Sequence, residues 1–242
     1  EYAENGSLRK YLNNQNGIEL LPKVFVQNII YDVAYGMKEL YKKRVHHRDL
    51  KADNVLLDRD MIAKVSDFGL SKADALITSA SSKSSKVGTP AWQSPEELDD
   101  EDVVDDEKCD VYSFGITIFE IITCKLPWQN IKPSKIMIKV LQGKRPEYDK
   151  TISSQKYGVL CINTMEQCWA KNPLDRPTFA VLLDNIKTFR RSNSNNNSHV
   201  RQKSEDEARK RRDKEKIITR KKEVEEEEDN NDNVKLPVVV VN

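Results

Sequence analysis

Residues 46–54 read His-His-Arg-Asp-Leu-Lys-Ala-Asp-Asn, and residues 67–69 read Asp-Phe-Gly. Between these two segments, Val55-Leu56-Leu57 is a short apolar run, which is typical of a buried strand. We expect the polar side chains of the two segments to converge on one site.

The side chains in these segments suit the transfer of a phosphoryl group. Such a group carries charge on its equatorial oxygens during transfer, so catalysis consists mostly of placement and charge compensation. Asp49 is expected to accept the proton of an attacking hydroxyl, and Lys51 to face the transferring phosphate as a compact cation. Asn54 and Asp67 are expected to offer oxygens to Mg2+, a hard cation. The alternative interpretation treats all four as solvated loop residues beside a strand.

The two segments resemble the catalytic loop and the magnesium-binding segment of eukaryotic protein kinases. Three later segments resemble the same family in the same order: the end of the activation segment, the start of the central helix and the stretch before the last helix, at residues 88–96, 110–115 and 168–179. The resemblance implies an α+β fold in which residues 1–190 form the hinge and the mainly α-helical C-terminal lobe, with the small β-rich N-terminal lobe absent.

The resemblance also implies structural roles. Glu96 is expected to pair with Arg176, and Asp110 to hold the backbone of the catalytic loop. Thr89 is expected to hydrogen-bond near Asp49 and Lys51. Taken singly, Arg176 and Asp110 would be interpreted as surface charges.

The branch of the family follows from a mixture of features. Lys51 and residues 88–90 look like those of serine/threonine kinases, whereas residues 112–115 and 168–177 look like those of tyrosine kinases. This mixture resembles the tyrosine-kinase-like group, whose members mostly phosphorylate Ser and Thr in protein substrates. Tyrosine or dual specificity is the alternative.

Residues 1–8 resemble the hinge between the two kinase lobes. The resemblance implies that Glu1 and Ala3 bind the adenine of ATP and that Leu56 lies beneath it. No Gly-rich loop and no strand lysine of the family can be placed in the sequence, so we expect the chain alone to transfer phosphate poorly. A pseudokinase-like scaffold is one alternative function. A small-molecule phosphotransferase is a weaker one, because residues 88–96 look suited to holding a polypeptide.

Arg48 resembles the arginine of kinases that an upstream kinase activates by phosphorylating the activation segment. An arginine can bind such a phosphate with two hydrogen bonds. Ser84 and Ser85 are the preferred sites, because they lie closest to residues 88–89. The alternative is a Ser-rich loop without a switch.

Local patterns predict the helices. Ser7 should cap a short helix that runs through Leu12, and Pro22 should open a longer one. Core helices are expected at residues 111–122, from a cap at Ser134, around residues 160–169 and from about Thr178. The last three of these helices should bury large apolar residues: Ile136, Ile138, Leu141, Leu160, Met165, Trp169, Phe179, Leu182, Leu183 and Ile186.

Composition and charge bear on the partners, the location and the C-terminal tail of the protein. The formal net charge is +1, so nucleic-acid binding gains no electrostatic support. The four cysteines show no metal-binding spacing, and reduced thiols in a cytoplasmic protein are expected. No stretch is long and apolar enough to span a membrane. The acidic run 99–107 is expected to be a solvated loop, although it could favour basic substrates. Residues 191–242 read as a charged tail, disordered or forming a solvated helix, and its basic residues 209–212 could bind an anionic surface.

Overall fold

The computed structural model describes residues 3–15, 21–67, 89–99 and 105–188. Among the predicted sites, Glu1, Ser84 and Ser85 lie outside the described residues, as does the tail. The described elements, in chain order, are α1 (Leu8–Asn13), α2 (Lys23–Lys42), the 3-10 helix η1 (Ala52–Asn54), β1 (Val55–Leu57), β2 (Ala63–Val65), α3 (Pro95–Leu98), α4 (Asp106–Thr123), α5 (Pro133–Leu141), α6 (Lys150–Tyr157), α7 (Val159–Cys168) and the 3-10 helix η3 (Pro173–Asp175). Residues 179–188 are also helical.

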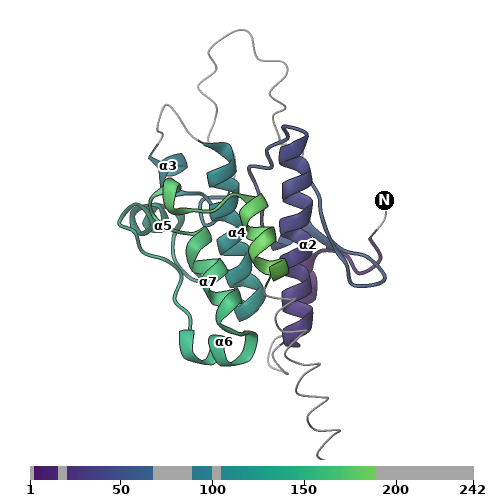
Figure 1. Ribbon diagram of the computed structural model, residues 1–242. Helices are drawn as coiled ribbons and strands as arrows, with labels where there is room; N and C mark the ends of the chain where they lie inside the picture. The colour runs from purple at the N-terminus through teal and green to yellow at the C-terminus, as the bar shows by residue number, and fades with distance from the viewer. Residues whose placement is uncertain (1–2, 16–20, 68–88, 100–104, 189–242) are drawn as a thin grey trace, which may run out of the picture. The chain divides into compact units, whose positions relative to one another are not determined.

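Helix α4 forms the centre of the core, with α2 on one side and α7 on the other (Figure 1). Every residue from Cys109 to Ile122 is buried, which confirms the prediction of a helix enclosed on all sides. Gly115 allows α7 to approach, because a Cβ atom at this position would lie 2.9 Å from Cβ of Cys168 and 3.0 Å from the backbone nitrogen of Trp169. The contact between α4 and α7 therefore depends on the missing side chain.

Local signals set the starts of the first two helices. The Ser7 hydroxyl accepts a hydrogen bond from the backbone N–H of Lys10, so Ser7 caps α1 as predicted. Pro22 immediately precedes α2, which also agrees with the prediction. The last predicted helix is confirmed too, and it buries the four apolar residues expected of it: Phe179, Leu182, Leu183 and Ile186.

Three details of the helix predictions were wrong. Ser134 does not cap α5; the helix begins at Pro133 and Lys132 is the capping position. Proline suits the first helical position, because its fixed φ fits the helix and its missing N–H is not needed there. Ile138 is 56% exposed and therefore is not a core residue. Helix α6 was not predicted; Asp149 caps it by accepting the N–H of Ile152 at 2.9 Å.

Strands β1 and β2 form an antiparallel hairpin with Leu56 opposite Lys64. The N-terminal segment runs along the other edge of β1, where the N–H of Leu57 donates to the carbonyl of Gly6 at 2.9 Å. This confirms the predicted strand at 55–57. Two short strands among many helices in the described part also confirm the α+β, mainly helical fold class. Within the described residues, no helix combines the length and the apolar character needed to cross a membrane.

Candidate active site

Asp49, Lys51 and Thr89 form a closed triangle of hydrogen bonds. The Lys51 ammonium donates to Oδ2 of Asp49 at 2.7 Å and to Oγ1 of Thr89 at 3.1 Å. The Thr89 hydroxyl donates to Oδ1 of Asp49 at 3.3 Å. The Asp49 and Lys51 side chains are only 12% and 19% exposed, so the pair is partly withdrawn from water. The structure thus brings together three residues that are separated by up to forty positions in the sequence.

Asn54 joins the same group. It ends η1, the single turn that follows Lys51, and its amide nitrogen donates to the backbone carbonyl of Asp49 at 2.7 Å and to Oδ2 at 3.0 Å. Both bonds use the nitrogen, and the amide oxygen accepts no hydrogen bond from a described residue. That oxygen is therefore the atom that could bind a hard cation.

Asp67 is tied to this loop through its neighbour Ser66. The N–H of Ser66 donates to the carbonyl of Asn54 at 2.9 Å, and His47 Nε2 lies 2.9 Å from the carbonyl of Ser66. The backbone N–H of Asp49 donates to Nδ1 of His47 at 3.3 Å. In this arrangement Nε2 of His47 faces a carbonyl acceptor and Nδ1 faces an N–H donor. A single histidine thereby connects the loop at Asp49 to the backbone that precedes Asp67.

Asp110 fixes the start of the loop from the core. Its carboxylate accepts the backbone N–H groups of His47 and Arg48, both at 2.7 Å, and the hydroxyl of Tyr41 at 2.6 Å. Burial raises the pKa of Asp110, while these donors act to lower it. Arg48 has a φ of +66°, a conformation that is uncommon for a non-glycine residue and needs support from its surroundings. Asp110 provides part of that support.

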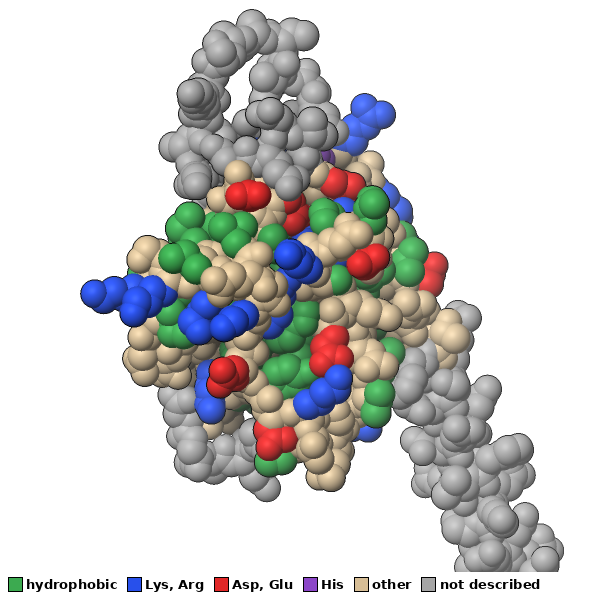
Figure 2. Space-filling model, turned by 90° about the vertical axis from the view of Figure 1, so that its left-hand side faces the viewer, with side chains coloured by type: hydrophobic (Ala, Val, Ile, Leu, Met, Phe, Trp, Pro, Cys, Tyr) green, Lys and Arg blue, Asp and Glu red, His purple; other side chains and the backbone are tan. Residues whose placement is uncertain are grey.

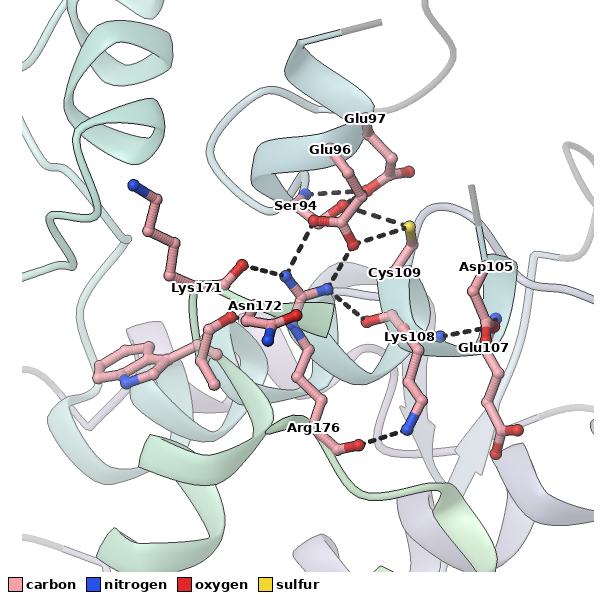
Figure 3. Close-up of polar contacts among 12 residues, drawn as sticks. Ser94, Glu96, Glu97, Asp105, Glu107, Lys108, Cys109, Lys171, Asn172 and Arg176 are labelled. Atoms are coloured by element: carbon pink, nitrogen blue, oxygen red, sulfur yellow. Dashed lines mark hydrogen bonds and ion pairs between the residues drawn. The ribbon is translucent and has the colours of Figure 1, made fainter. Parts of the chain in front are cut away.

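Glu96 and Arg176 form a two-pronged ion pair (Figure 3). The Arg176 side chain is completely buried, and it also donates to the backbone carbonyls of Ala170, Lys171 and Lys108. Burial acts to raise the pKa of Glu96, but hydrogen bonds from Arg176 outweigh it and hold the pKa below its usual value. The pair joins α3 to the segment after α7.

Beside this pair, Ser94 caps α3 in a capping box with Glu97 (Figure 3). The Ser94 hydroxyl donates to Glu97 at 2.7 Å and lies 3.2 Å from the sulfur of Cys109. The Ser94 hydroxyl therefore makes a local contact between α3 and α4.

A surface pocket lies beside α3 and the end of α5. Figure 2 shows the side of the molecule that lies at the left in Figure 1, where acidic, basic and apolar side chains are mixed. The pocket is lined by Pro95, Glu96, Asp99, Leu141, Lys171 and Pro173. None of the phosphoryl-transfer candidates lines it, so it is separate from the Asp49 cluster.

The sequence interpretation missed two groups of residues. Buried Glu120 on α4 accepts hydrogen bonds from the Arg9 guanidinium, from the N–H of Ala52 at 3.0 Å and from the Trp92 indole at 2.8 Å. Asp106 binds His46 and Arg48. The signal for Glu120 was present, because a lone carboxylate within an apolar helix requires buried partners. Nothing local marked Asp106 among its acidic neighbours.

The predicted adenine-binding residues are only partly described. Gly6 donates its N–H to the carbonyl of Ala3 at 3.1 Å, which bends the N-terminal segment toward β1. Leu56 forms an isolated bridge with Ser7. Ala3 and Leu56 therefore belong to the same edge of the structure.

Comparison with known proteins agrees with this geometry. The family described as protein tyrosine and serine/threonine kinase matches residues 1–186. The chain is 38% identical over 195 residues to the serine/threonine-protein kinase CTR1 of Arabidopsis thaliana, which covers 79% of the chain and 23% of CTR1. It is 34% identical over 181 residues to the serine/threonine/tyrosine-protein kinase HT1 of the same plant, which covers 74% of the chain and 44% of HT1.

A probable LIM domain-containing serine/threonine-protein kinase of Dictyostelium discoideum is 37% identical over 193 residues, covering 79% of the chain and 28% of that protein. The chain thus spans less than half the length of each of these relatives. The predicted resemblance to the tyrosine-kinase-like serine/threonine kinases is confirmed. The chain belongs to the protein tyrosine and serine/threonine kinase family.

Proposed function

We propose that the protein containing this chain transfers the γ-phosphate of ATP to Ser and Thr hydroxyls of protein substrates. The observation that carries the proposal is the cluster in which Asp49 contacts Lys51, Thr89 and Asn54 within 3.3 Å. A carboxylate, a cation and a free amide oxygen meet there, as phosphoryl transfer requires.

Each residue has a role in this proposal. Asp49 accepts the proton of the substrate hydroxyl, and Lys51 compensates charge on the transferring group. Thr89 connects the end of the activation segment to Asp49 and Lys51, so that the substrate hydroxyl is held next to Asp49. Positioning of this kind supplies much of the rate enhancement in enzymes.

The residues present fit a magnesium ion. The amide oxygen of Asn54 and the carboxylate of Asp67 are hard oxygen donors, and Mg2+ is usually held by one or two protein groups together with phosphates and water. When bound, the ion would neutralise phosphate charge. Glu1, Ala3 and Leu56 would contact the adenine of ATP.

Two further points belong to the proposal. Arg48 would bind a phosphate on Ser84 or Ser85, placed there by an upstream kinase. A cytoplasmic location is supported by four free cysteines. A second specificity, toward tyrosine, is favoured by the name of the relative HT1.

The test uses the protein expressed from its full native transcript and measures radiolabelled phosphate transfer from ATP to a generic protein substrate. Asp49→Asn should lower kcat by at least about 100-fold, because a general base contributes roughly 10²–10⁴. Asp53→Asn is the matched control: Asp53 lies in the same loop but is exposed, so activity should stay within about twofold. Equal activity of wild type and Asp49→Asn would refute the proposal, and absence of transfer by the wild type would favour a scaffold.

The same reaction decides the substrate side chain. Acid hydrolysis of the labelled product should yield phosphoserine and phosphothreonine. A predominance of phosphotyrosine would replace the proposed specificity with the alternative. The 242-residue chain alone should give little transfer, and turnover equal to that of the full protein would contradict this expectation.

A further inference from the structure

Asp106 lies at the first position of α4, at the end of the acidic run 99–107. The structure directs its carboxylate toward the catalytic loop rather than into water. Oδ2 lies 2.7 Å from Nη2 of Arg48 and 2.6 Å from Nδ1 of His46. The three side chains are 25%, 26% and 15% exposed, respectively. The expectation of a solvated acidic loop is therefore wrong for this residue.

The start of the helix does not need the Asp106 side chain. Asp105 already caps α4, because its carboxylate accepts the N–H groups of Glu107 and Lys108 at 3.0 and 3.3 Å. The carboxylate of Asp106 accepts no N–H of its own helix among the described contacts. Its position is therefore explained by its two partners in the loop.

Arg48 is held from two points on one face of α4. Asp106 and Asp110 are four residues apart, so they lie on the same side of the helix. Asp110 accepts the backbone N–H of Arg48 at 2.7 Å, and Asp106 binds its guanidinium. The backbone of Arg48 is left-handed, and its Nε is buried without a partner among the described residues. Such an arrangement persists only when the surroundings impose it.

We propose that Asp106 is a positioning residue that gives Arg48 its counter-charge from within the chain, so that the Asp49 loop is set without a phosphate on the activation segment. This inference rests on the proposed phosphoryl transfer, and it replaces the proposal that a phosphate on Ser84 or Ser85 is the partner of Arg48. A phosphate would bring a charge of about −1.5 to −2 to a guanidinium that already binds a carboxylate. The phosphate would meet repulsion from Asp106 and would add little order to the loop.

The test again uses the protein from its full native transcript, in two states: as purified, and after phosphatase treatment verified by mass spectrometry. The wild type should keep at least about half of its kcat after treatment. Asp106→Asn keeps the shape but removes the charge. It should lower kcat of the treated protein by about tenfold, with KM for ATP changed less than about twofold, because an orienting charge-assisted hydrogen bond is weakened.

Two controls separate positioning from folding. Asp105→Asn should leave kcat unchanged, because asparagine caps a helix as well as aspartate does. Asp106→Glu should restore part of the activity lost in Asp106→Asn, since it returns the charge to the same guanidinium. Loss of activity in the wild type on phosphatase treatment, or normal kcat in treated Asp106→Asn, would overturn the inference. Absence of any transfer by the wild type would instead overturn the proposed function, and this inference with it.

A second measurement on the 242-residue chain does not depend on activity. If Asp106 acts on Arg48, the double variant Asp106→Asn/Arg48→Gln should melt no lower than the less stable of the two single variants, because the shared interaction is lost only once. Additive decreases in Tm would show that the two residues act independently and would overturn the proposal.

Discussion

The carboxylate of Glu96 and the guanidinium of Arg176 face each other in two hydrogen bonds, one of them 2.9 Å long, inside the protein. Eighty positions separate them in the sequence. The pair joins the end of the activation segment to the segment that precedes the last helix, so it links residues that are expected to hold a polypeptide to the core.

Removal of one partner of the Glu96–Arg176 pair should strongly lower the free energy of unfolding. Glu96→Ala leaves Arg176 buried and without its counter-charge, and such a change typically lowers the free energy of unfolding by about 3–5 kcal/mol. The control is Lys150→Ala, which removes the exposed pair with Glu166; exposed pairs contribute only about 0–1 kcal/mol. Urea unfolding of both variants measures the difference, and equal losses would contradict a buried role for the Glu96 pair.

The same pair predicts how stability depends on pH. The pKa of Glu96 is lower in the folded protein than its ordinary value of 4.5. As pH falls from 4.5 toward the folded pKa, unfolded chains take up a proton at Glu96 before folded ones do, so this contribution to stability is lost. The stability deficit of Glu96→Gln relative to wild type should therefore shrink below about pH 4.5. Unfolding in urea at a series of pH values checks this, and a deficit that grows on acidification would contradict it.

Glu120 predicts a difference between two tryptophans. Trp92 and Trp128 are both 8% exposed, but only the Trp92 indole donates to a carboxylate, that of Glu120. Nε1 of Trp128 is buried without a partner among the described residues. Trp92→Phe should therefore lower the free energy of unfolding by about 1.5–3 kcal/mol more than Trp128→Phe, since hydrogen bonds to charged groups are worth that much.

Urea unfolding of the two tryptophan variants provides the measurement. If Trp128→Phe lowers the free energy of unfolding more than Trp92→Phe does, the packing of the rings and not the hydrogen bond to Glu120 dominates at these sites. Burial raises the pKa of Glu120, while the charge of Arg9 acts to lower it, so the two variants are compared at the same pH.

Gly115 predicts a steric limit between helices. Gly115→Ala should lower the free energy of unfolding by about 1–3 kcal/mol, because the new methyl group would overlap Cys168 and the backbone at Trp169. Alanine is a better helix former than glycine by about 1 kcal/mol, so without the steric contact the substitution should raise the free energy of unfolding. A decrease therefore indicates that the contact between α4 and α7 limits the space at this position. Gly36→Ala on α2 is the control: its Cβ would meet only the Val65 side chain, at 3.0 Å, which can shift.

Thermal unfolding of the two glycine variants gives the answer. A Gly115→Ala protein that is as stable as wild type would mean that α4 and α7 can move apart without loss of stability. A Gly36→Ala protein less stable than Gly115→Ala would locate the tighter contact at β2 instead.

The sequence by itself determined the family, the strand at 55–57 and the starts of α1 and α2. These features depend on residues close together in the chain: a motif with fixed spacing, an apolar run, a serine before a helix and a proline after a loop. The same local reasoning failed at α5, where Pro133 and Ser134 compete for the helix start and the proline geometry prevails.

Only the tertiary structure decided the partners of Glu120 and Asp106. Glu120 meets Arg9 across 111 positions, and Asp106 meets His46 across 60. Neither contact leaves a periodic pattern, since the energy of a buried charge depends on groups that the fold brings near it and not on its neighbours in sequence. The resemblance to the kinases pointed to Asp49, Lys51, Thr89 and Asn54, and also to Asp110 on α4. The contacts that Asp106 and Glu120 of the same helix make with the loop became visible only in the tertiary structure.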